Sequence, residues 1–260
     1  MDTNATAGLS QALTMLWKGE AAGREAPRRN TRPGLSLEAV VTAAVEIADA
    51  EGLAGLSMAA VAHRLGFTTM SLYRYVSSKD VLLVLMHDKA TAMTAASPAP
   101  PSSSGWRGRL ESWTRDQVTM YVRHPWLSDM KITGPPLTPA SLDWMERGLA
   151  AMQDTGLDET EKLGVIATIT GYVRHEAAFA KDLSRPDPQQ SSADGYGQTL
   201  ARLVDPATHP ALSALISDGV FDNEPPDSQA ADYLAEDFEF GLELILSGIA
   251  TLIEQRGRAS

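Results

Sequence analysis

Residues 57–79 read SMAAVAHRLGFTTMSLYRYVSSK, and their spacing predicts two short helices joined by a tight turn. Ser57 is expected to cap the first helix, because its hydroxyl can accept from the first free backbone N–H groups. Gly66 is expected to end that helix, since glycine adopts a positive φ at little cost. Thr68 is then the N-cap of the second helix. A helix, a short turn with glycine and a second helix are the layout of a DNA-binding helix-turn-helix.

The inward faces of the two helices are apolar at helical spacing, and they comprise Val61, Ala62, Leu65, Leu72 and Val76. The remaining side chains of the second helix then face outward or flank the seam. Thr69 and Ser71 can hydrogen-bond base edges, and Met70 can contact a thymine methyl. Arg74 can pair with guanine or with the backbone. The predicted DNA contacts on this segment are Thr68, Thr69, Met70, Ser71, Tyr73, Arg74, Tyr75 and Lys79.

The string SLYRYVSSKDVLL, preceded by LSMAAVAHRLGF and by a helix ending in IADAEGLAGL, resembles the N-terminal domain of the TetR family of bacterial repressors. The resemblance covers about residues 35–90. It implies that Tyr73 and Lys79 contact phosphates and position the helix. A lysine at a helix N-terminus is unfavourable for the helix dipole, and it is easier to understand if it meets a phosphate there.

The resemblance also implies an all-α chain, in which the helix-turn-helix domain precedes a larger ligand-binding and dimerisation domain of the tetracycline-repressor-like class. Its implied partners are a palindromic double-stranded DNA operator, a small-molecule inducer and a second copy of the chain. A ligand that prefers misplaced recognition helices must lower operator affinity by linkage. We therefore expect a ligand-responsive regulator, most simply a repressor.

The net charge of −11 argues at first against a nucleic-acid partner, but its distribution removes the objection. Residues 1–95 hold nine Lys/Arg and nine Asp/Glu, whereas residues 96–260 hold 13 and 24. The excess acid therefore belongs to the second part of the chain, and the first part is permitted to bind DNA.

Residues 1–34 contain a weakly amphipathic stretch, Leu9–Trp17, that can form a short helix, and then a polar segment rich in Gly, Pro and Arg. Such a segment cannot bury enough apolar surface to fold alone. One interpretation is a solvated tail. The other is a flexible arm that follows DNA, because arginines inserted in the minor groove meet its negative potential. The arm interpretation adds Arg28, Arg29 and Arg32 to the predicted DNA contacts.

The Pro- and Ser-rich segment 97–105 indicates a domain boundary. The expected division is a flexible arm at 1–34, a DNA-binding domain at 35–96 and a ligand-binding and dimerisation domain at 105–260. Everything after the boundary reads as helix. Breaks are expected at His124–Pro125, and a helix over residues 140–154 is expected to stop before Gly156.

Aromatic and methionine side chains are concentrated between residues 106 and 179. Most helix-spaced aromatics pack in a core, but a subset can line an apolar cavity with a few polar groups. The predicted ligand contacts are Trp113, Tyr121, His124, Trp126, Met130, Trp144, Tyr172, His175 and Phe179. By the resemblance, Lys131 falls near the metal-binding histidine of tetracycline-binding relatives, where a cation would repel a metal ion. We expect no metal and no cofactor.

The last helix, over about residues 230–256, is apolar on more than one face and must be buried by more than one neighbour. Glycines such as Gly164 and Gly248 would allow close helix approach. We expect a homodimer through the helices near 160–182 and 230–256, in agreement with the resemblance. A monomeric buried helix is the alternative, but it leaves the helix-turn-helix without a second half-site.

The five histidines are scattered, and the sequence contains no H-E-x-x-H, phosphate-binding glycine loop or nucleophile elbow. We therefore expect that the protein is not an enzyme. It has no cysteine, no apolar run of membrane-spanning length and no convincing signal peptide, so a cytoplasmic protein with no membrane partner is expected. The alternative function is a helical protein that binds a small molecule or a partner without binding an operator.

Overall fold

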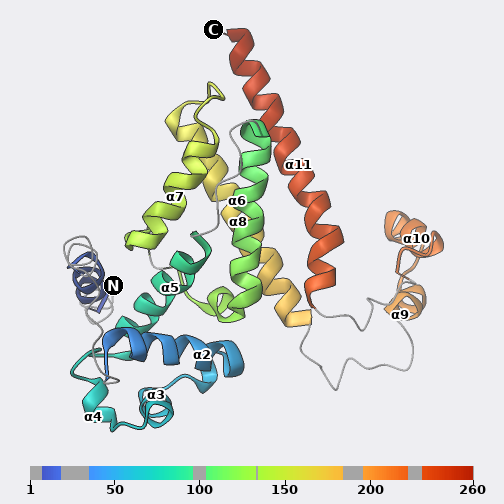
Figure 1. Ribbon diagram of the computed structural model, residues 1–260. Coiled ribbons are helices and arrows are strands. Elements are labelled where there is room, and N and C mark those ends of the chain that lie inside the picture. Colours follow the sequence, from blue (N-terminus) through green and yellow to red (C-terminus); the bar gives the residue numbers. More distant parts are fainter. Residues whose placement is uncertain are drawn as a thin grey trace. The chain divides into compact units, whose positions relative to one another are not determined.

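The computed structural model describes residues 8–18, 35–95, 104–132, 134–183, 196–221 and 230–259, and these residues form helices and connections without a strand. They belong to two compact units. The larger unit comprises Met1–Ala178 with Glu243–Ser260, and the smaller unit comprises Phe179–Leu242. The all-α class expected from the sequence is confirmed (Figure 1).

A helix over residues 8–18, here called the N-terminal helix, is the first described element, at the position expected for Leu9–Trp17. The elements that follow are α2 (Leu37–Gly55), α3 (Met58–Leu65), α4 (Thr69–Leu72), α5 (Lys79–Ala95), α6 (Gly105–Arg123), the 3₁₀ helix η2 (Pro125–Asp129), α7 (Pro139–Ala151), α8 (Glu159–Leu183), α9 (Tyr196–Leu203), α10 (Pro210–Ser217) and α11 (Ala230–Ala259). In the described parts, no helix is long and apolar enough to cross a membrane.

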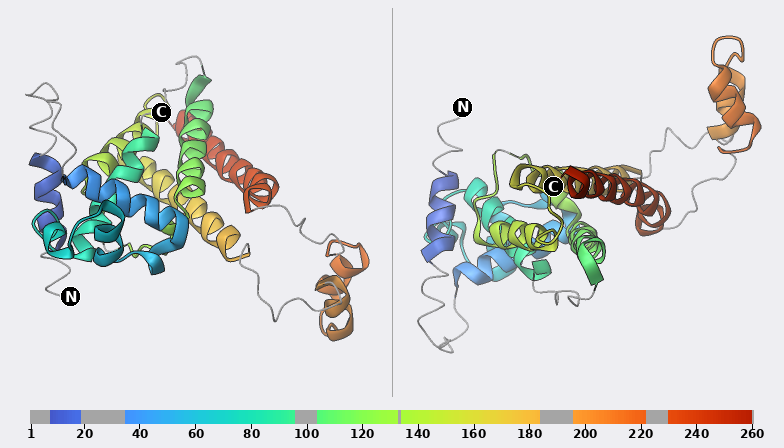
Figure 2. Two further views of the ribbon diagram at one scale, coloured as in Figure 1. Left: turned by 60° about the horizontal axis from the view of Figure 1, so that its bottom comes forward. Right: turned by 90° about the horizontal axis from the view of Figure 1, so that it is seen from above.

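Helix α2 provides the scaffold of the first domain. Its N-cap Ser36 accepts from Ala39 N, and its buried stripe of Val40, Val41, Ala43, Ala44, Val45, Ile47 and Ala48 packs on α3 and α5. Gly52 has a φ of 69° and interrupts the helical backbone, because glycine adopts a positive φ at little cost. The chain turns there toward Leu56, which is buried and leads into the N-cap of α3. Figure 2 shows α2, α3 and α4 gathered at one end of the larger unit.

The helices after residue 104 begin close to the expected positions, but α7 ends earlier and α11, at Ala259, three residues later than expected. Helix α6 stops at Arg123, before His124 and Pro125. Helix α7 ends at Ala151, three residues earlier than expected. A turn replaces its last residues, because Thr155 Oγ1 donates to Met152 O at 2.7 Å and Gly156 takes a φ of 71°.

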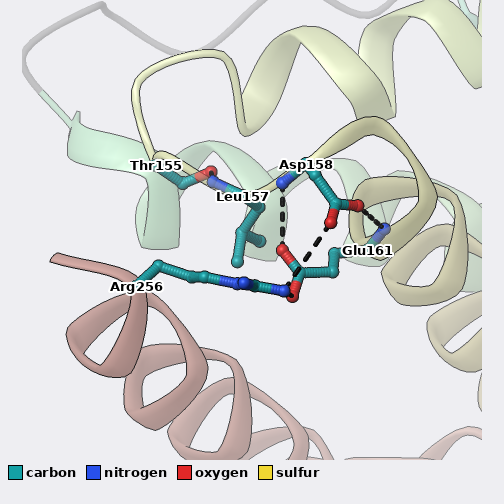
Figure 3. A network of polar contacts seen from close by, with 5 residues as sticks. All are labelled: Thr155, Leu157, Asp158, Glu161 and Arg256. Atoms are coloured by element: carbon teal, nitrogen blue, oxygen red, sulfur yellow. Dashed lines mark hydrogen bonds and ion pairs between the residues drawn. The ribbon is translucent and has the colours of Figure 1, made fainter. Parts of the chain in front are cut away.

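The N-terminus of α8 is joined to the C-terminus of α11 by charged side chains (Figure 3). Asp158 and Glu161 form a reciprocal capping box, in which each carboxylate accepts from the other residue's backbone N–H at 2.9 Å. Arg256 of α11 donates to Glu161 and lies 3.6 Å from Asp158. The hydrogen bond from Arg256 holds the pKa of Glu161 below its usual value. The two helices are thereby held together at this end.

The core between α6, α7 and α8 is closely packed around Gly148. The rings of Trp113 and Trp144 stack with centroids 5.5 Å apart, and Trp113 Nε1 donates to Trp144 O at 3.0 Å. A Cβ added at Gly148 would lie 2.9–3.0 Å from the Trp113 ring and would also meet Ile166. Glycine is required here because the indole fills the space that a methyl group would need.

We expect Gly148→Ala to destabilise the protein by about 1–3 kcal/mol, because the Trp113 ring is fixed by its stack and hydrogen bond and cannot move aside freely. Thermal or urea unfolding measures this change. Gly257→Ala is the matched control, since a Cβ there meets nothing within 4 Å and alanine favours a helix. Equal stability of the two variants would show that the core around Trp113 has room to relax.

Candidate DNA-binding and ligand-binding sites

Helix α3 and helix α4 are joined by a turn whose backbone is fully specified by local hydrogen bonds. Ser57 Oγ accepts from Ala60 N at 3.0 Å. Gly66, with a φ of 72°, donates its N–H to His63 O, and Phe67 N donates to Ala62 O at 3.0 Å. These two bonds form a Schellman motif, which ends α3 sharply. All the caps expected from the sequence are confirmed.

Helix α4 is a single turn that is fixed from both sides. Thr68 Oγ1 accepts from Ser71 N at 3.4 Å and lies 2.9 Å from Ser71 Oγ. Leu72 and Val76 are completely buried, whereas Met70 keeps 74% of its surface exposed. The inward and outward faces expected for this segment are therefore confirmed.

The structure leaves the predicted DNA contacts of α4 on the surface. Thr68, Met70, Tyr73, Arg74 and Tyr75 are exposed, and Thr69 and Ser71 are half-buried. The hydroxyls of Thr68 and Ser71 form a hydrogen bond with each other, so a base that contacts either hydroxyl would have to share it. Arg28, Arg29 and Arg32 lie outside the described residues.

Lys79 has intramolecular partners that the sequence did not indicate. Its Nζ donates to Leu56 O at 2.7 Å and to Leu53 O at 3.4 Å, across the chain segment between α2 and α3. These acceptors explain a lysine at the start of α5 without a phosphate. The helix-dipole argument therefore loses its force, and the phosphate contact of Lys79 stays a prediction from the resemblance alone.

The charges of residues 35–95 do not favour DNA by themselves. This segment holds four lysines and arginines against six aspartates and glutamates. Arg64 on α3 is paired with Glu46 on α2 at 2.7 Å, and both side chains are about half exposed. Arg74, two residues after the end of α4, is exposed, whereas Arg64 and Lys79 have carboxylate and carbonyl partners.

Two exposed side chains at the helix-turn-helix were not among the predicted contacts. Phe67 is 44% exposed in the turn, and His63 is exposed on the last turn of α3. An apolar residue directly after Gly66 reads as core in a sequence. The position of Phe67 between the C-cap Gly66 and the N-cap Thr68 could have indicated that its side chain is exposed.

The predicted ligand contacts fall into separate groups. Trp113 and Trp144 form the stacked pair described above, and the Arg147 guanidinium lies 5.2 Å from the Trp144 ring centroid. Tyr121 and Met130 are linked through Arg174 of α8. That side chain hydrogen-bonds the Tyr121 hydroxyl and donates to Met130 O and, at 3.1 Å, to Ser128 O.

A third group connects the two domains. His124 Nδ1 lies 2.7 Å from Asp49 Oδ1, and Trp126 Nε1 donates to the same oxygen at 2.7 Å. His124 and Trp126 are buried, so the carboxylate of Asp49 on α2 is held by two groups of the ligand-binding region. This geometry gives His124 and Trp126 a structural role that is independent of any ligand.

The other predicted ligand contacts are less enclosed. Tyr172 is half-buried, His175 is exposed, and Phe179, which belongs to the smaller unit, is 43% exposed. The nine residues therefore do not form one buried cluster. Within the described ranges, no group of three or more His, Cys, Asp or Glu side chains is arranged to hold a metal ion.

Buried polar atoms identify residues that sequence patterns missed. Gln117 Oε1 and Trp144 Nε1 are buried without a hydrogen-bond partner among the described residues. Such atoms are costly unless a water or ligand satisfies them. Gln117 lies one turn of α6 beyond Trp113. Arg174 interacts electrostatically with Tyr121, one further turn along α6, and with His87 of α5. A single polar residue in a helix gives no signal of burial in a sequence.

A short, capped helix-turn-helix joined to a larger set of helices is the layout of a DNA-binding regulator. A family model described as "Bacterial regulatory proteins, tetR family" matches residues 40–86. A second, described as "Tetracyclin repressor-like, C-terminal domain", matches residues 97–253. The chain belongs to the TetR family, and the family expected from the sequence is confirmed.

Relatives and solved structures agree with this assignment. The chain is 38% identical, over 98% of its own length and 90% of the relative, to the HTH-type transcriptional repressor DrrR1 of Streptomyces coeruleorubidus. Apo ActR from Streptomyces coelicolor matches with a TM-score of 0.67 and 25% identity, covering 88% of this chain and all of ActR. ActR in complex with actinorhodin also matches with a TM-score of 0.67, at 26% identity over 85% of this chain and 99% of ActR.

We expect acid to destabilise the protein through His87. Burial lowers the pKa of His87 below its usual value of 6.5, and Arg174 adds to this while Asp88 opposes it. The unfolded chain therefore binds a proton more readily than the folded one. The stability contributed by neutral His87 is complete above pH 6.5 and is lost as the pH falls through its folded pKa.

Melting temperatures between about pH 8 and about pH 5.5, where carboxylates stay ionised, measure this dependence. His87→Leu is expected to reduce the decline on acidification, whereas His63→Gln, with its exposed ring, serves as the control. A decline of the same size in wild type and His87→Leu would assign the pH dependence to other groups.

Proposed function

We propose that the protein is a ligand-responsive transcriptional repressor that binds a palindromic operator as a homodimer and is released by a small molecule. The observation that carries this proposal is the presentation of α4. Buried Leu72 and Val76 anchor α4 and the turn after it, whereas Met70 of α4 and Tyr73 and Arg74 of the turn are exposed. Named relatives that are repressors, such as DrrR1, support the direction of the regulation.

The proposed roles of the exposed side chains follow from their chemistry. Met70 reads a thymine methyl, and Thr69 and Ser71 exchange hydrogen bonds with base edges or phosphates. Tyr73 and Tyr75 hold the helix on the DNA backbone through their hydroxyl groups. Arg74 supplies a charged contact to guanine or phosphate.

We further propose that the arginine-containing segment at 19–34 supplies much of the attraction to DNA. Residues 35–95 have fewer cations than anions, and two of their four cations have intramolecular partners. Arg24, Arg28, Arg29 and Arg32 precede this domain directly in the chain. Phosphate neutralisation by such residues drives sequence-independent affinity.

A face of small and apolar residues supports the proposed homodimer. On α8, Leu163 is 49% exposed, and Cβ atoms added at Gly164 and Gly171 would meet nothing. On α11, Leu244 is 60% exposed and Gly248 is equally open. Helices bearing such residues can approach a symmetric copy closely, and an isologous contact would place two copies of α4 on one duplex. The two reading helices must then sit about 34–36 Å apart.

The proposed ligand site lies beside the Trp113–Trp144 pair. Gln117 Oε1 and Trp144 Nε1 are a buried acceptor and a buried donor without hydrogen-bond partners among the described residues, and a ligand would have to separate closely packed side chains to reach them. These groups suit a planar aromatic molecule with both a donor and an acceptor. The ActR structure with actinorhodin supports a small-molecule inducer. Tyr121, His124, Trp126, Met130, Tyr172, His175 and Phe179 stay predicted contacts.

The proposed domain division keeps the sequence boundaries at 35–96 and 105–260, whereas the proposed arm is limited to residues 19–34 because residues 8–18 form a packed helix. Helix α5 follows α4, the proposed recognition helix, and packs on α6 and α7 of the proposed ligand-binding domain. Ligand binding beside α6 would change this packing and so misplace α4. The proposed operator is chromosomal DNA, so we place the protein in the cytoplasm and assign it no enzymatic step.

The DNA upstream of the protein's own gene is the probe for operator binding, measured by fluorescence anisotropy at several salt concentrations. Met70→Ala is expected to weaken specific binding about tenfold and leave non-specific binding unchanged, because it removes a base contact. Arg74→Ala is expected to lower the slope of log affinity against log salt by about one if Arg74 meets a phosphate.

Arg258→Ala is the matched control for these variants, since Arg258 is an exposed cation on α11, far along the chain from α4. Binding of a random duplex as tight as that of the upstream DNA would contradict the operator proposal. It would favour the alternative, a helical protein that binds a small molecule or partner without an operator.

Actinorhodin is a suitable probe for the ligand site because it is the compound named in the ActR complex. We expect it to quench the tryptophan fluorescence of the wild type. Gln117→Leu is expected to weaken this binding about tenfold, while the variant melts no lower than wild type, because it removes an unsatisfied buried acceptor. A variant that binds as tightly as wild type would exclude Gln117 from the site.

A further inference from the structure

The N-terminal helix lies outside the residues that the two family models match, yet it is packed on the DNA-binding domain. Its apolar residues recur at helical spacing at Leu9, Ala12, Leu13 and Leu16, and Ala12 is completely buried. A Cβ added at Gly8 would lie 3.7 Å from Val81 of α5. Figure 2 shows the helix against this domain in both views.

The first polar contact of the N-terminal helix is to Ser77, in the turn between α4 and α5. Ser77 Oγ donates to Gln11 Oε1 at 2.5 Å. Ser77 follows Tyr75 and Val76 and precedes the first residue of α5 by two positions. A displacement of α4 with the start of α5 would therefore have to break or carry this bond.

The second polar contact is to the ligand-binding region. Trp17 Nε1 donates to Leu137 O at 3.2 Å. Leu137 directly precedes Thr138, the N-cap of α7. The first turn of α7 is also held by α5, because Asp88 Oδ1 accepts from Ala140 N at 2.9 Å. The N-terminal helix and α5 thus both attach to the start of α7.

We propose that the N-terminal helix is an interdomain clamp, which fixes the Ser77 turn to the start of α7 through Gln11 and Trp17. The span between these two points includes the whole of α5, the element that joins the domains. A clamp in parallel with α5 limits how far α4 can shift relative to α7. Its effect on operator release rests on the proposed function, whereas its effect on the two attachment points does not.

Hydrogen exchange of the full-length protein, followed by mass spectrometry, tests the clamp directly. The variant Gln11→Ala with Trp17→Phe removes both polar contacts and keeps an aromatic ring at position 17. We expect amides in 69–85 and in 137–145 to exchange about fivefold faster together, as the loss of about one hydrogen bond at each attachment predicts. Amides in α8 are expected to keep their wild-type rates.

Thr14→Ala is the matched control, because Thr14 Oγ1 donates within the helix to Ser10 O and bridges nothing. Faster exchange confined to residues 8–18 in the double variant would overturn the clamp. Trp17→Phe alone provides a milder variant if the double variant unfolds, and it is expected to raise exchange at 137–145. Correlated exchange in a protein that binds no operator would uphold the clamp and refute the proposed function.

Discussion

A helix of four residues, such as α4, is not stable by itself, so its conformation depends on the residues that surround it. Nucleating a helix costs more than one hydrogen bond returns, so a single turn is stable only when other parts of the molecule impose it. Three features stabilise α4. Thr68 caps it, Gly66 ends α3 shortly before it, and buried Leu72 and Val76 anchor it and the following turn in the core. The side chains on its outer face can therefore be varied without changing the backbone that presents them.

Buried polar contacts, as well as apolar packing, join α2 to the helices that follow residue 104. Asp49 of α2 accepts from Trp126 in η2 and pairs with His124, the C-cap of α6. Arg174 joins α8 to the carbonyls of Ser128 and Met130 at the end of η2. Buried groups of this kind have few alternative partners, so a change at α6 must be passed on or leave polar atoms unsatisfied.

The local features of the fold could be predicted because each depends on residues close in the sequence. Caps, the break at Gly52, the end of α6 before Pro125 and the inward pairs of the helix-turn-helix all have signals within one turn. The partners of Lys79 could not be predicted, because its carbonyl acceptors at Leu53 and Leu56 lie 26 and 23 residues earlier in the chain, before α3 and α4. Gln117 and Asp49 were missed for the same reason. Their importance arises from burial and from long-range neighbours, which a single sequence does not encode locally.

The ion pair between Arg64 and Glu46 has a consequence for the way such a protein searches a genome. A free arginine beside the reading helix would strengthen attraction to every phosphate, and most phosphates belong to irrelevant DNA. Neutralising it keeps the residence on these competing sites short. Pairing with Glu46 therefore reduces the positive charge with which α3 would attract DNA of any sequence.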